Sequence, residues 1–135
     1  MNFGEWYLRR GRITRREWWL HYTLVLVVLA FLAALADASM GYPAFVMPAE
    51  PEGLYDYVGG PLSLFVSLFT LVPWISSTVA RLHDRGHSAW WLLWFLVPVV
   101  GWILLLVQNG FLRGDGGPNR YGPAPGHQVG DPVGV

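Results

Sequence analysis

The sequence predicts an all-α integral membrane protein: a three-helix bundle (residues 1–113) followed by a flexible, Gly/Pro-rich C-terminal tail (residues 114–135). The chain has 135 residues, of which 53% are hydrophobic and only 13% are charged, whereas soluble domains carry about 25% charged residues. Three apolar segments are each close to the ~20 residues that a helix needs to cross a bilayer. Aromatic residues make up 16% of the chain, and tryptophan and tyrosine concentrate at membrane interfaces.

The first predicted span covers residues 18–36. Thr14 and Glu17 have the spacing of a capping box, in which both side chains bind free amides at the start of a helix. The helix is therefore expected to begin near Arg15. His21 is the one titratable side chain inside this span.

A cleaved signal peptide is the alternative interpretation of this first segment. Residues 36–38 read A-D-A, which resembles the small-x-small pattern of a cleavage site after an apolar run. The N-terminal region is long and aromatic, however, and a capping box precedes the apolar run. These features favour a membrane helix that is retained.

The second and third predicted spans cover residues 62–80 and 89–107, and neither contains a charged side chain. Pro73 and Pro98 lie inside them and are expected to kink the helices, which neighbouring helices tolerate in a bilayer. Gly86 is expected to end the second helix, because glycine readily adopts the left-handed conformation found after helix C-termini.

Arginines are unevenly distributed among the segments that flank these spans. Five precede the first span, the loop of residues 37–61 contains no arginine or lysine, and Arg81 and Arg85 follow the second span. The positive-inside rule therefore predicts a cytoplasmic N-terminus and second loop, with the C-terminal tail outside. Arg113 and Arg120 in the tail oppose this placement, but they are outnumbered.

Two arginine-rich clusters, residues 11–19 and 81–91, are expected to meet at the cytoplasmic face. Guanidinium groups bind phosphate oxygens in pairs, so the clusters predict a site for an anion or a lipid head group. The candidate residues are Arg12, Arg15, Arg16, Arg81, His83, Asp84, Arg85, Trp90 and Trp91. The alternative is that the arginines only set the orientation of the protein, and that the tryptophans are interface anchors.

The same clusters contain residues that bind metals or transfer protons in other proteins. His83 and His87 have H-x-x-x-H spacing beside Asp84, but Gly86 interrupts the helix that would place both imidazoles on one face. His83 and Asp84 are either a proton-relay pair or a contact that orders the loop. The chain has no cysteine, which excludes thiolate chemistry. We therefore predict no catalytic residues, no bound metal and no cofactor.

Several motifs resemble those of a known family. Residues 11–19 read G-R-I-T-R-R-E-W-W, residues 81–91 read R-L-H-D-R-G-H-S-A-W-W, and residues 119–122 read N-R-Y-G. Further matching positions are Phe3, Tyr7, Pro73, Pro98 and Gly101. Together they resemble the domain of unknown function 805 family, a group of small bacterial inner-membrane proteins. Ala80 and Ala89 depart from the arginine and glycine that this family often has there. The resemblance implies a fold type and a location but no established activity.

The sequence favours a non-enzymatic membrane component that binds lipid or a partner membrane protein. The expected partners are membrane lipids, above all anionic phospholipids, and a second copy of the chain or another membrane protein. Nucleic acid is not expected, because the formal net charge is zero. The alternatives are an oligomeric channel or transporter subunit, disfavoured by spans without central charges, and a membrane enzyme using His83 and Asp84.

Overall fold

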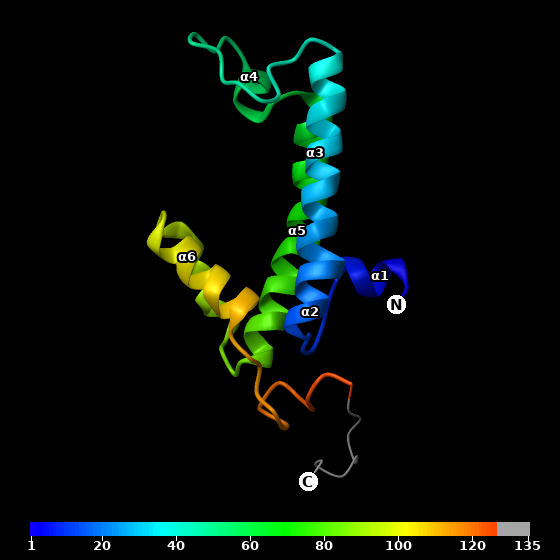
Figure 1. The fold of residues 1–135 in the computed structure, drawn as a ribbon, viewed down its shortest axis with the longest axis vertical. Coiled ribbons are helices and arrows are strands. Elements are labelled where there is room, and N and C mark those ends of the chain that lie inside the picture. Colours follow the sequence, from blue (N-terminus) through cyan, green and yellow to red (C-terminus); the bar gives the residue numbers. More distant parts are fainter. Residues whose placement is uncertain (127–135) are drawn as a thin grey trace. The chain divides into compact units, whose positions relative to one another are not determined.

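The computed structural model describes residues 1–126, which are helical and contain no β-strand (Figure 1). The chain forms two compact units: unit 1 contains Met1–Tyr22 and the chain from Pro73 onward, and unit 2 contains Thr23–Val72. The helical elements are α1 (Phe3–Tyr7), α2 (Arg15–Glu17), η1 (Trp18–Thr23), α3 (Leu24–Ser39), α4 (Leu54–Val58), α5 (Pro61–Asp84), η2 (Ala89–Leu96), α6 (Val100–Leu106) and η3 (Val107–Phe111).

Two helices are long and apolar enough to cross a membrane. Elements α2, η1 and α3 run on as one helix of 25 residues, Arg15–Ser39, and α5 has 24 residues. The start of the first helix follows from local sequence: the Thr14 hydroxyl accepts a hydrogen bond from the Glu17 amide (3.1 Å), so the predicted helix start at Arg15 is confirmed. Gly86 adopts the predicted left-handed conformation (φ 72°) just after the end of α5.

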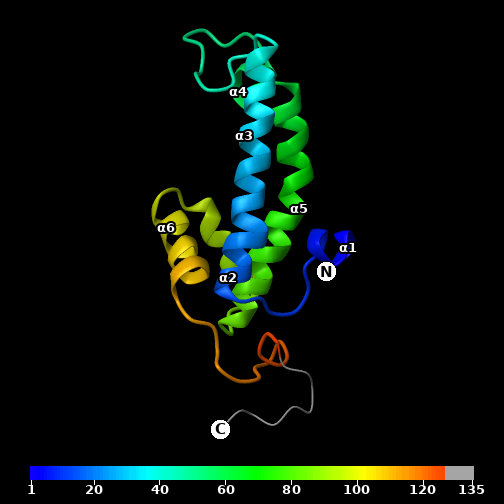
Figure 2. The same cartoon turned by 45° about the vertical axis from the view of Figure 1, so that its right-hand side comes forward.

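In unit 2, α3 and the first half of α5 lie side by side (Figures 1 and 2). Asp37, in the last turn of α3, is fully buried and accepts hydrogen bonds from the amides of Leu62 (3.1 Å) and Ser63 (2.7 Å). It therefore caps the N-terminus of α5, where free amides and the helix dipole favour a carboxylate. Gly60 makes room for it, because a Cβ there would lie 2.4 Å from Asp37 Cγ.

The surfaces of these two helices are apolar in the isolated chain. Large side chains such as Phe31 on α3 and Phe65 and Leu68 on α5 are more than half exposed. Soluble monomers rarely expose contiguous apolar surface of this extent. Hydrocarbon chains of a bilayer are the solvent that such helices require.

The third apolar segment is not one helix, so the predicted three-helix bundle is not confirmed. Its first part, η2, is a 3₁₀-helix, and α6 begins only after a break at residues 97–99. Figure 2 shows η2 and α6 side by side, joined at one end. Val99 has a positive φ of 65°, and Val97 is extended, as a residue before proline prefers.

Close packing inside this η2–α6 hairpin depends on Gly101. A Cβ at Gly101 would lie 1.7 Å from the carbonyl oxygen of Trp94, so no other residue permits this contact between the two helices. The indole of Trp102 donates a hydrogen bond to the Phe95 carbonyl (2.9 Å). The apolar helix Val100–Phe111 is too short to qualify as a membrane span, and at about 1.5 Å per residue it covers well under the ~30 Å of a hydrocarbon core.

The Gly101→Ala substitution tests this hairpin. The added methyl group should push η2 away from α6 and lower the free energy of unfolding by about 1–3 kcal/mol. Gly116→Ala is the control, since a Cβ there would meet nothing within 4 Å, and it should change stability by less than about 0.5 kcal/mol. The measurement is thermal unfolding of both variants in detergent, followed by tryptophan fluorescence. Equal stability of the two variants would contradict the hairpin.

Candidate functional site

The centre of the candidate site is a carboxylate buried between two guanidinium groups. Asp84, the last residue of α5, accepts a hydrogen bond from Arg12 Nε on Oδ1 (3.0 Å) and one from Arg81 Nη1 on Oδ2. All three residues are buried, with Arg81 fully inaccessible. Arg81 and Asp84 are three positions apart on α5, which places them on the same helix face. We call Arg12, Arg81 and Asp84 the Asp84 lock.

The remaining donors of Arg12 hold the chain that follows η3. Nη1 donates to the carbonyls of Gly117 (2.7 Å) and Gly122 (3.0 Å), and Nη2 donates to the carbonyl of Asp115 (2.7 Å). Arg12 therefore joins the N-terminal segment to a stretch more than 100 residues further along the chain. The planar guanidinium, with its five donors, suits such multiple contacts better than a lysine would.

Arg81 completes the lock from the other side. Its Nε donates to the carbonyl of Asn109 (2.9 Å), and its Nη2 donates to the carbonyl of Leu112. Both guanidinium groups thus donate hydrogen bonds to Asp84 and to backbone carbonyls. Two buried cations face one buried anion, and the carbonyl dipoles offset part of the remaining positive charge.

The first part of the tail is fitted closely to Asp84. A Cβ at Gly114 would lie 1.7 Å from Asp84 Oδ2, so this position requires glycine. The amide of Asp115 donates to the carbonyl of Asp84 (2.7 Å). A Cβ at Gly116, Gly117 or Gly122 would meet nothing within 4 Å, so among these glycines the close fit is confined to Gly114, and the flexibility of the tail stays a prediction. Residues 127–135 lie outside the described part of the chain.

The N-R-Y-G motif, residues 119–122, packs against the last turn of α5 and the turn that follows it. The Tyr121 ring stacks on the His83 imidazole, with centroids 3.9 Å apart. Asn119 Nδ2 donates to the His83 carbonyl (2.9 Å), and Arg120 donates to the Gly86 carbonyl (3.1 Å). Together with the Arg12 contacts to the carbonyls of Asp115, Gly117 and Gly122, these bonds hold the start of the tail beside the N-terminal segment.

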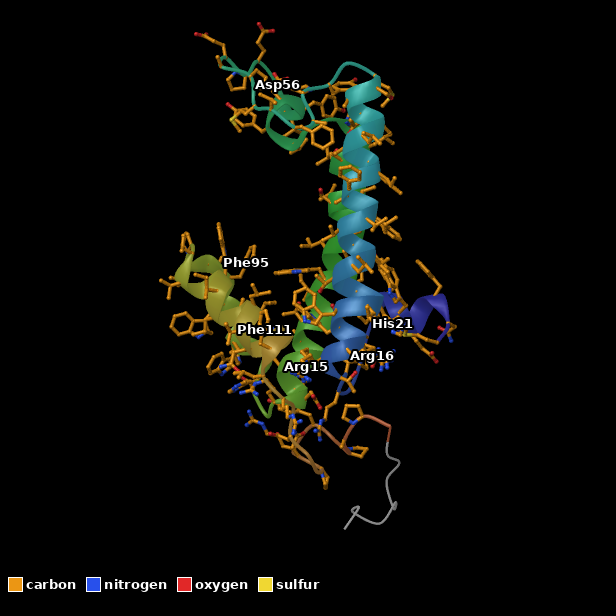
Figure 3. The ribbon with its side chains drawn as sticks, in the orientation of Figure 1. Arg15, Arg16, His21, Asp56, Phe95 and Phe111 are labelled. Atoms are coloured by element: carbon orange, nitrogen blue, oxygen red, sulfur yellow. The ribbon has the colours of Figure 1, made fainter. Side chains whose placement is uncertain are left out.

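The other predicted site residues lie around the lock and do not bind Asp84. Arg15 is exposed and donates to the Phe111 carbonyl (2.9 Å); Figure 3 labels both residues. Arg85 donates to Gln108 Oε1 (2.7 Å) and to the Arg113 carbonyl. Arg16 and Trp90 are exposed, and the Trp91 ring packs on His87 with centroids 4.1 Å apart.

The chemistry open to this arrangement is limited. Both oxygens of Asp84 accept hydrogen bonds from cations, so the carboxylate is poorly placed to act as a free base. Within residues 1–126, no three histidine, aspartate or glutamate side chains lie close enough to share a metal ion. The sequence analysis did not identify Gly114 or Asn109 as part of the site. The polar pair Gln108–Asn109, directly after an apolar run, was the signal that could have indicated Asn109.

Neutralising the central carboxylate should loosen the site. In Asp84→Asn, the buried guanidinium groups of Arg12 and Arg81 lose their counter-charge, and the free energy of unfolding should fall by about 3–5 kcal/mol. The tail should also be released, so trypsin should cleave after Arg113 and Arg120 faster than in the parent protein. Glu50→Gln is the control, because it removes the same charge from an exposed side chain. The lock is refuted if both variants are digested at the parent rate.

Comparison with known proteins assigns the sequence to a family. Residues 7–123 match the model of the family described as "Protein of unknown function (DUF805)", a range that includes every residue of the Asp84 lock. The Escherichia coli K12 protein named "Inner membrane protein YhaH" is 34% identical, and the alignment covers 90% of this chain and 96% of that protein.

A second relative supports the same assignment. The Escherichia coli K12 protein named "Inner membrane protein YhaI" is 31% identical, over 90% of this chain and 95% of that protein. No solved structure matches significantly. Because the family model covers most of the sequence and both relatives align along nearly their whole length, this chain belongs to the DUF805 family.

Proposed function

We propose that this protein is a non-enzymatic, multi-pass component of the bacterial inner membrane that binds anionic phospholipid head groups. Family membership, the names of the two relatives and the two long apolar helices support the location. The observation that carries the binding proposal is the Asp84 lock. It binds Arg12 and Arg81 internally and fixes the surrounding chain, which presents further arginines to solvent.

The proposed topology has two spans and a re-entrant hairpin. Arg12 binds the carbonyls of Asp115, Gly117 and Gly122, so the tail returns to the side of the N-terminus. The η2–α6 hairpin then enters the membrane and leaves it on the same side. Backbone of this kind is tolerated at membrane depth where it is packed against protein.

In this topology, Arg113 and Arg120 in the tail no longer oppose the positive-inside rule. All nine basic residues of the chain are arginines outside residues 23–72, and with a re-entrant hairpin all nine belong to one side. The positive-inside rule makes that side cytoplasmic. The loop between α3 and α5, which contains only acidic charges, then faces the periplasm.

The exposed arginines are the groups that can meet lipid phosphates. They are Arg10, Arg15, Arg16, Arg113 and Arg120. Arg15 is tied to η3 through Phe111, and Arg120 is tied to the turn after α5 through Gly86. Contacts to the backbone thus hold cations from distant segments around the lock. Each basic residue near an anionic membrane surface contributes about 1 kcal/mol to the attraction.

The contacts of the lock also bear on the enzymatic alternative. A general base needs a free lone pair within reach of its substrate, whereas Asp84 is enclosed by two cations and His83 is covered by Tyr121. A binding role therefore agrees better with the geometry than a catalytic role.

Single-cysteine labelling tests the topology, since the chain has no cysteine of its own. Spheroplasts carrying Leu8→Cys, Ala49→Cys or Gly116→Cys are treated with a membrane-impermeant maleimide before and after lysis; all three sites are exposed. Ala49→Cys should react in intact spheroplasts, and the other two should react only after lysis. Labelling of Gly116→Cys from outside would show that the third segment crosses the membrane.

Lipid retention tests the binding site. Native mass spectrometry of protein released from nanodiscs should show bound phosphatidylglycerol. The double variant Arg15→Gln, Arg16→Gln should weaken that binding about 5- to 30-fold, as expected for two lost cations. The matched control Arg15→Lys, Arg16→Lys keeps both charges and should retain most of the lipid. If the glutamine variant keeps the parent amount, the head-group proposal fails.

A further inference from the structure

A cavity of about 160 Å³ lies within unit 1, between the η2–α6 hairpin and the second half of α5. Its apolar walls are Trp18, Trp74, Phe95, Trp102, Leu105 and Leu106. Four aromatic rings from four different elements thus line it, and it opens to the surface beside Phe95, Trp102 and Leu106, which are partly exposed. In the proposed topology, these elements lie in or beside the membrane, so the cavity is reached by molecules that dissolve in the bilayer.

Two polar side chains complete the lining. Thr78 on α5 and Asn109 on η3 are 2% and 1% exposed. Thr78 Oγ1 and Asn109 Oδ1 have no hydrogen-bond partner among residues 1–126. Buried polar atoms are nearly always paired, so two unpaired atoms on one cavity require an explanation. Water can pair such atoms but leaves the apolar walls without partners, whereas a ligand that combines an apolar body with a polar group meets both.

The hydrogen bonds around Asn109 define what its oxygen needs. Nδ2 donates to the carbonyl of Leu105 (2.8 Å), which fixes the orientation of the amide and leaves Oδ1 turned to accept a hydrogen bond. The backbone carbonyl of the same residue accepts from Arg81 Nε (2.9 Å), so the Asp84 lock holds Asn109 in position. A fitting ligand must therefore bring a donor.

The size and walls of the cavity define the rest of the ligand. An apolar protein cavity of about 150 Å³ accepts benzene, and aromatic walls favour an aromatic guest through stacked or edge-to-face contacts. We propose that this cavity binds a small neutral aromatic alcohol of the size of phenol. The ring lies among the tryptophans, its hydroxyl donates to Asn109 Oδ1, and the Thr78 hydroxyl donates to the ligand oxygen.

The test uses the full chain in nanodiscs and the indole N–H resonances of its tryptophans. Trp18, Trp74 and Trp102 line the cavity, and Trp90, which is 76% exposed, is the internal reference. Single Trp→Phe variants assign the resonances. The probes are 4-fluorophenol and 4-fluorotoluene, and ¹⁹F signals give the concentration of each probe within the bilayer. The three lining resonances should shift saturably, with about 3- to 10-fold tighter binding of the phenol, as one added hydrogen bond predicts.

Two variants separate the cavity from the bilayer. Leu106→Trp fills the cavity and should abolish the saturable shifts for both probes. Thr78→Val keeps the volume but removes the hydroxyl, and should reduce the preference for the phenol while both probes still bind. Thermal unfolding of each variant shows that the fold is retained. If Leu106→Trp does not fold, Leu106→Phe takes its place.

Three outcomes overturn the proposal. The first is a non-saturating shift of all four indoles, which reports partition into lipid only. The second is equal affinity for the two probes. The third is a set of nuclear Overhauser effects from lipid acyl chains to Trp18 and Trp74 that the phenol does not displace, which identifies an acyl chain as the occupant. None of these outcomes depends on head-group binding by Arg15 and Arg16.

Discussion

The structure of unit 1 depends on one carboxylate shared by two arginines. Arg12 and Asp84 are 72 positions apart. The other donors of Arg12 bind carbonyls that lie about 30 residues beyond Asp84 in the chain. A buried carboxylate without these cations, or either cation without the carboxylate, would be strongly unfavourable. The three segments are therefore stable in this arrangement only together, which makes the lock the main determinant of where the tail lies.

The conformation of the third apolar segment follows from the need to bring the tail back to Arg12. A straight helix from residue 89 onward would carry the chain away from Arg12 by about 1.5 Å per residue, whereas the tail must return to it. Pro98 interrupts the backbone hydrogen bonding, and Gly101 lets α6 pack directly against the Trp94 carbonyl. Hairpin and lock thus support each other: the hairpin brings residues 112–122 back, and the lock holds them there.

Sequence reasoning succeeded where structure is local. The capping threonine at residue 14, the helix end at Gly86 and the two long apolar helices follow from neighbouring residues. It did not predict that the third segment forms two short helices, because hydropathy is the same for one long helix and for two short ones; the break at Pro98 and the contact of Gly101 with Trp94 distinguish them. The cap that Asp37 provides for α5 was likewise missed, since its partners are 25 and 26 positions away. Asp84 was predicted to belong to the site of the two arginine-rich clusters, but which arginines bind it depends on the tail, which holds Arg12 through its backbone carbonyls.

The lock also divides the arginines into two kinds, and this division limits what the protein can bind. Arg12 and Arg81 are buried and donate to Asp84 and to backbone carbonyls, so a phosphate cannot reach either guanidinium without displacing these contacts, and both arginines are structural. In the proposed function, the exposed arginines bind lipid phosphates without breaking any contact to Asp84. Arg81 has a further effect through Asn109: its Nε holds the backbone carbonyl of the residue whose side-chain oxygen lines the aromatic cavity. The position of that acceptor is therefore set by the same buried charges that hold the tail, which is why a polar atom can remain fixed in an otherwise apolar wall.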